Sequence, residues 1–128
     1  MYRTVIFNSA FPNEWKFDEY DIPTAPGARE LAELIASKLR LHVRSVSAVD
    51  QHEYYGWAFA ATTEYATFYN VLNPVDECYL TVSMDWYATK ALLLQRPREK
   101  FDRYCEALTD ALGEIAEVSN IQWEDYRR

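Results

Sequence analysis

The residues of this chain best suited to chemistry are a histidine and the carboxylates beside it. His52 lies between Asp50 and Glu53 in the stretch DQHE, residues 50–53. An imidazole flanked by carboxylates could hold a metal ion or transfer a proton. Three neighbouring residues cannot complete a coordination sphere, however, and no HExxH or cysteine–histidine spacing supplies further ligands. The sequence therefore predicts a polar turn here, with no metal and no cofactor.

Other candidate catalytic residues lack the arrangement that catalysis requires. Ser45 and Ser47 follow His42 closely, but no GxSxG elbow presents a nucleophile. The glycines are isolated, so no glycine-rich loop can surround a phosphate. Adjacent acids such as Asp18 and Glu19 recur, but a catalytic pair must converge in space, which adjacency in sequence does not establish. The sequence favours a protein without catalytic activity, and an enzyme stays an alternative.

The most regular charge pattern is a row of acidic residues in the stretch 97–117. Its members are Glu99, Asp102, Glu106, Asp110, Glu114 and Glu117. A helix would place all of them on one face, opposite an apolar stripe from Phe101 to Ile115, because they are spaced by three or four residues. No Lys or Arg occurs between positions 104 and 126 to offset their charge.

This acidic row is unfavourable for folding by itself. Like charges four residues apart destabilise a helix by about 0.2–0.5 kcal/mol per pair, and acids near its C-terminal end oppose the helix dipole. A packed helix tolerates such terms, so an ordinary solvated face is one interpretation. The other interpretation is an electronegative ridge, with Asp102, Glu106, Asp110 and Glu114 as contact residues, that attracts a basic protein and accelerates its association.

A second unusual pattern is the density of aromatic residues between positions 53 and 72. In a strand at 54–61, the large side chains would point to one face and the small ones to the other. Pairing through a two-residue turn at 62–63 would place Phe68 beside Trp57. Large and small neighbours would then fill the space between the strands without overpacking.

Aromatic residues occupy both faces of the expected sheet, and two helices can cover only one. We therefore expect some aromatic side chains to stay accessible and to anchor a partner, with Tyr55, Trp57, Tyr65 and Tyr69 as the predicted contacts. Two alternatives stay open. The same side chains, together with Tyr54, could line a small-molecule pocket or an active site. The aromatic face could instead be the interface of a homodimer or another homo-oligomeric structural protein.

Periodicity and punctuation predict the elements that would position these residues. We expect strands at about 2–7, 43–49, 54–61, 64–72 and 78–86, helices near 26–40 and 97–117, and a short terminal strand at 121–123. Residues 8–26 contain three prolines and are expected to be irregular. This order predicts a single α+β domain over residues 1–128, with a mostly antiparallel sheet of four to five strands and two amphipathic helices packed on one face.

The overall charge restricts the partners that the chain can bind. The 128 residues include 20 acidic and 13 basic ones, which gives a formal net charge of −7. Nucleic acids and anionic membranes are disfavoured, because both are bound mainly through Lys and Arg. No signal peptide or membrane-spanning stretch is apparent, which predicts a cytoplasmic location. The predicted function is a small, acidic, non-catalytic protein-binding domain, inhibitor-like, immunity-like or an adaptor, that engages a basic partner surface.

Overall fold

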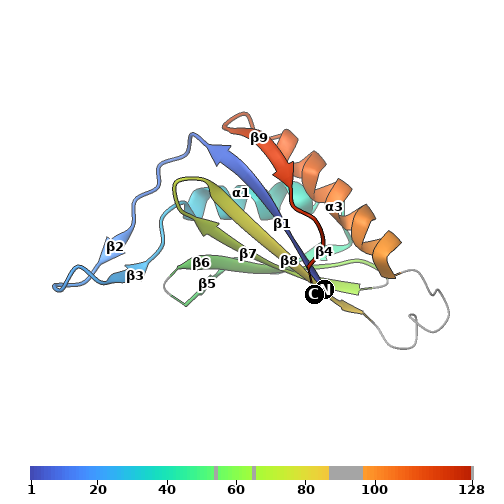
Figure 1. Ribbon diagram of the computed structural model, residues 1–128, viewed down its shortest axis with the longest axis horizontal. Helices are drawn as coiled ribbons and strands as arrows, with labels where there is room; N and C mark the ends of the chain where they lie inside the picture. Colours follow the sequence, from blue (N-terminus) through green and yellow to red (C-terminus); the bar gives the residue numbers. More distant parts are fainter. Residues whose placement is uncertain (54, 65, 87–96, 128) are drawn as a thin grey trace.

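The computed structural model describes residues 1–53, 55–64, 66–86 and 97–127. In chain order its elements are β1 (Tyr2–Ser9), β2 (Lys16–Phe17), β3 (Pro23–Ala25), α1 (Arg29–Leu39), β4 (Ser45–Val46), β5 (Asp50–His52), β6 (Gly56–Thr62), β7 (Ala66–Pro74), β8 (Cys78–Trp86), α3 (Pro97–Gly113) and β9 (Val118–Trp123). Figure 1 shows the long strands gathered into one twisted sheet, with α1 and α3 on the same side of it.

Seven of the described strands form the main sheet. β6, β7, β8, β1 and β9 lie in that order, and the short strands β4 and β5 both pair with β6. All of these pairings are antiparallel. The predicted α+β class with a large antiparallel sheet is confirmed, whereas the predicted four to five strands were too few. β4 and β5 have only two and three residues, and strands so short cannot display a period-two pattern.

The core lies between the helices and one face of the sheet. Alternate side chains of β1, β6, β7 and β8 point into it, as the period-two pattern requires. Phe68 of β7 is fully buried there, and its ring stacks on Tyr104 with the centroids 4.1 Å apart. The Phe101 ring meets the Phe68 ring edge-on, with the centroids 5.6 Å apart. These aromatic contacts attach α3 to the middle of the sheet.

The pairing of β6 with β7 differs from the sequence prediction by four residues. Phe68 lies opposite Ala61, and Leu72 lies opposite Trp57. The predicted two-residue turn was wrong, because such turns favour Gly or Asn with positive φ, which this segment lacks. The chain instead forms a wider connection, in which Thr63 N donates to the Ala66 carbonyl at 2.9 Å. A shift of four is even, so every side chain keeps its predicted face.

Both described helices are shorter than the sequence predicts. α1 begins at Arg29, because Ala28 has a left-handed backbone with φ of 61°. α3 ends at Gly113, a residue type with low helix propensity. Glu114 and Glu117, two acids expected on the helix, therefore lie between α3 and β9. Neither described helix is long and apolar enough to cross a membrane.

The long segment before α1 contains structure that the sequence does not reveal. β2 and β3 pair with each other in a two-stranded sheet of their own. Figure 1 shows this hairpin projecting from the body of the molecule, at the end opposite α3. We call residues 16–25 the arm. At its base, Trp15 Nε1 donates to the Pro74 carbonyl at 3.2 Å, and Gln51 Nε2 donates to the Thr24 carbonyl at 2.8 Å.

Candidate partner-binding surface

The outer face of α3 carries four of the six acids of the predicted row. The inner face is buried through Phe101, Tyr104, Cys105, Leu108, Ala111 and Leu112. Glu99, Glu106 and Asp110 are exposed, and Asp102 is half-buried. The acidic row therefore follows the solvent side of α3. Glu114 lies beyond the end of the helix, so from here on the ridge means Asp102, Glu106 and Asp110.

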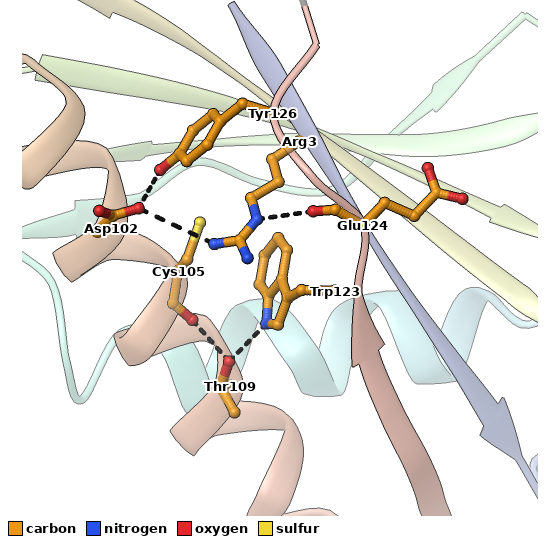
Figure 2. Close-up of polar contacts among 7 residues, drawn as sticks. All are labelled: Arg3, Asp102, Cys105, Thr109, Trp123, Glu124 and Tyr126. Carbon is orange, nitrogen blue, oxygen red and sulfur yellow. Dashed lines mark hydrogen bonds and ion pairs between the residues drawn. The ribbon is translucent and has the colours of Figure 1, made fainter.

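Asp102 belongs to a cluster of residues from both ends of the chain (Figure 2). The Tyr126 hydroxyl donates a hydrogen bond to its carboxylate, and the Arg3 guanidinium lies 3.9 Å from it. Arg3 also donates through Nε to the Glu124 carbonyl at 2.8 Å. Its guanidinium carbon lies 5.0 Å from the Trp123 ring centroid and 5.1 Å from that of Tyr126. The charge of Asp102 is thus partly balanced within the molecule.

Beside this cluster is a depression of about 340 Å³ that opens along the ridge. Its lining residues are Arg3, Asp102, Cys105, Glu106, Thr109, Asp110 and Trp123. The Trp123 indole donates to the Thr109 hydroxyl at 2.8 Å, and that hydroxyl donates to the Cys105 carbonyl at 2.8 Å. This chain of hydrogen bonds fixes the orientation of the indole (Figure 2). Burial raises the pKa of the Cys105 thiol to about 12, so the lining holds a protonated thiol at neutral pH.

Two further acids of the row have partners elsewhere. Glu114 Oε1 lies 2.9 Å from His42 Nε2, which links the turn after α3 to the turn after α1. Glu99 Oε1 lies 3.6 Å from Arg103 Nη2, one helical turn away. For Glu106 and Asp110, the structure shows no ion pair with any described residue. The unpaired negative charge of α3 is therefore concentrated at these two positions.

Trp57, the central aromatic residue of the predicted contact set, lies in the core. Its side chain is 6% exposed, and its indole donates to the Gly27 carbonyl at 2.8 Å. The Arg29 guanidinium carbon lies 5.4 Å from its ring centroid. Trp57 thus joins the start of α1 to the sheet, and only a small part of it is accessible, in a depression that Arg29 and Gln51 also line.

Two of the predicted tyrosines, Tyr55 and Tyr69, are described, and neither lies in the acidic depression beside α3. Tyr55 is half-buried and meets the His52 ring edge-on at 5.5 Å. Tyr69 is 48% exposed, but it alternates with Phe68 along β7 and so points to the sheet face opposite the helices. Tyr54 and Tyr65 lie outside the described residues. The ridge therefore does not form one continuous surface with Tyr55 and Tyr69.

The histidine-centred turn has the geometry of a strand end. His52 is the last residue of β5, opposite Gly56 of β6, and Glu53 follows in a left-handed turn with φ of 53°. Within the described ranges, no group of three or more His, Cys, Asp and Glu residues could share a metal ion. The local arrangement is accounted for by strand pairing and a turn.

Two residues of the site escaped the sequence prediction. In the sequence, Trp123 is only the last large residue of a short terminal stretch, and Arg3 is a single cation in the first strand. Neither belongs to a pattern that indicates a binding site. Only the pairing of β1 with β9 brings them together beside α3. Comparison with protein-family models, curated proteins and solved structures found no significant match. The chain's own geometry and charge therefore carry the functional argument.

Proposed function

We propose that this chain is a small, acidic, non-catalytic protein-binding domain, inhibitor-like, immunity-like or an adaptor, that engages a basic surface of another protein. The observation that carries the proposal is the pair of exposed, unbalanced carboxylates of Glu106 and Asp110, next to the oriented indole of Trp123. A partner's Lys or Arg side chain suits this depression, because carboxylates and an indole face both attract cations.

Arg3 supports this interpretation from within the molecule. Its guanidinium already contacts the Trp123 ring and Asp102 at the other end of the depression. An arginine of this chain thus makes the kind of contact that we propose for a partner's cation at Glu106 and Asp110. Arg3 occupies the end of the depression at Asp102, whereas the end at Asp110 is open. A partner's cation would therefore enter at the Asp110 end.

The ridge would act mainly on the rate of association. Complementary surface charges steer encounter over about one Debye length, which is about 10 Å at 0.1 M salt. Affinity would come from contacts that exclude water around the inserted cation. The proposal therefore predicts binding that weakens as the salt concentration rises.

The test is charge reversal at Glu106 and Asp110, measured by surface plasmon resonance against a partner purified together with this chain from its source cells. Glu106→Lys with Asp110→Lys should slow association by about tenfold at low salt and flatten its salt dependence. Asp102 is left unchanged, because its removal would also disturb Arg3 and Tyr126.

The matched control is Asp76→Lys with Asp85→Lys, which changes the net charge equally at two exposed acids outside the ridge. If this control slows association as much as the ridge variant does, net charge and not the ridge controls the encounter. Unchanged binding of the ridge variant would refute the proposal outright.

The homodimer is a second candidate, because Tyr69 is exposed on a sheet face that no described helix covers. Ala60 and Ser83 flank it on the neighbouring strands, so its ring stands above small residues. Sedimentation equilibrium would show twice the mass of the chain for a dimer through this face, and Tyr69→Glu would restore the monomer. A monomeric wild-type chain would exclude this candidate.

A further inference from the structure

Among the residues that the structure describes, the arm exposes the densest group of large apolar side chains. Phe17 is 56% exposed, Tyr20 is 76% exposed and Ile22 is 57% exposed. All three lie within six consecutive residues at the outer part of the hairpin (Figure 1). Grouped apolar side chains at such exposure mark interaction surfaces in soluble proteins.

Hydrogen bonds within the turn hold the tip of the arm in one conformation. One carboxylate oxygen of Asp18 accepts hydrogen bonds from the backbone N–H groups of Tyr20 at 2.8 Å and Ile22 at 3.0 Å. Asp18 N in turn donates to the Ile22 carbonyl at 3.0 Å, and Asp21 adopts a left-handed conformation with φ of 58°. The apolar side chains are thus presented by a preformed turn, which lowers the entropy lost on binding.

The charge around the tip limits what can bind there. Residues 14–22 contain the exposed acids Glu14, Asp18, Glu19 and Asp21, with Lys16 as the only cation, so this stretch has a net charge of −3. Nucleic acids and anionic lipids would be repelled. A second copy of this chain is also disfavoured, because each copy has a net charge of −7 and would bring the same acidic tip.

The exposed area also favours a protein partner. A large side chain buries roughly 150–250 Å² when fully covered, so the three together offer on the order of 350 Å². A standard interface buries about 800 Å² on each partner. The arm can therefore supply the apolar centre of an interface, with its carboxylates forming the polar rim.

We propose that the arm is a docking element that inserts Phe17, Tyr20 and Ile22 into an apolar cleft bordered by Lys and Arg on another protein. Its carboxylates pair with those cations around the rim. The arm and α3 lie at opposite ends of the molecule (Figure 1), so the arm is a second surface, independent of the ridge and testable separately from it.

The first experiment places the photo-crosslinking residue p-benzoylphenylalanine at Tyr20 of the full chain in its source cells. The control position is Leu41, which is 75% exposed but lies outside the arm. We expect a cross-link to one other protein of net positive charge from Tyr20 and none to that protein from Leu41. Cross-linking to a second copy of the chain, to lipid or to nothing would overturn the proposal.

The second experiment measures binding to the purified cross-linked protein by isothermal titration calorimetry. Tyr20→Ser should weaken binding by about 30-fold, as truncation of an interface anchor does. Glu19→Gln with Asp21→Asn should reduce its salt dependence. These positions are exposed, so the midpoint of thermal unfolding should not change. If Tyr20→Ser binds the cross-linked protein within about threefold of wild type, the proposal is overturned.

The same partner tested with the ridge variant separates the two proposals. Loss of binding in the arm variant alone would refute the ridge for this partner and leave the arm intact. Loss in the ridge variant alone would refute the arm and support the function proposed for α3.

Discussion

The hydroxyl of Tyr104 is expected to contribute to stability out of proportion to its size. Tyr104 is 2% exposed and donates to Asn70 Oδ1 at 2.7 Å, while Asn70 is 1% exposed. The Asn70 amide nitrogen donates to the carbonyls of Phe59 at 3.3 Å and Phe68 at 3.1 Å. The hydrogen bond therefore joins α3 to β6 and β7 through a buried polar group.

Substitution of Tyr104 by Phe removes the donor and leaves the Asn70 oxygen buried without a partner. The expected loss in the free energy of unfolding is about 1–3 kcal/mol, the cost of an unsatisfied buried acceptor. The ring itself should stay in place, because its stacking on Phe68 does not involve the hydroxyl. Roughly 4 °C in the melting temperature corresponds to each kcal/mol for a domain of this size.

Urea denaturation followed by tryptophan fluorescence measures this loss, and two further variants test its cause. Tyr126→Phe removes a hydroxyl in a half-buried position, where water can reach Asp102 instead, so a smaller loss is expected. Tyr104→Phe combined with Asn70→Leu removes both polar partners and should recover part of the stability. A loss at Tyr104 no greater than that at Tyr126 would refute the reasoning.

Two further predictions concern pH and glycine. Burial raises the pKa of Cys78 from 9.0 to about 11 and that of Cys105 to about 12, so the unfolded chain releases these protons first. The contribution of these thiols to the free energy of unfolding should therefore be constant below about pH 9 and be lost as the pH rises from 9 toward 12, as measured in urea; a free energy of unfolding that does not fall over this range would contradict the burial of both thiols. Gly27→Ala should destabilise, because a Cβ there would lie 2.3 Å from Asn13 Oδ1 and 2.6 Å from a backbone nitrogen. Gly113→Ala meets no atom within 4 Å and should stabilise α3 by about 0.5–1 kcal/mol, and thermal unfolding that ranks the two variants the other way would contradict this account.

The sheet illustrates how far sequence reasoning can reach. Alternation along β6 predicted which of its side chains share the core face, because that pattern depends only on the period of a strand. The pairing of Trp57 with Leu72 could not be predicted from this alternation, because the width of the turn after Thr62 determines the register. The faces were nevertheless correct, because the error in register was an even number of residues.

The candidate site was less accessible from the sequence than the fold. The acidic row on α3 follows from spacing, but the distribution of its charge depends on contacts made by residues far away in the chain. Arg3 balances Asp102 across 99 positions, and His42 meets Glu114 across 72. Such partners are brought together by strand and helix packing, and no local pattern encodes them.

The sequence by itself determined the α+β class, the faces of the strands and the acidic outer face of α3, because each depends on local periodicity and composition. The tertiary structure decided which of these residues could meet a partner. It buried Trp57 under α1, balanced Asp102 with Arg3, and left Glu106 and Asp110 open beside Trp123. Exposure and ion pairing are properties of residues brought together from distant segments, so they arise only when the chain has folded.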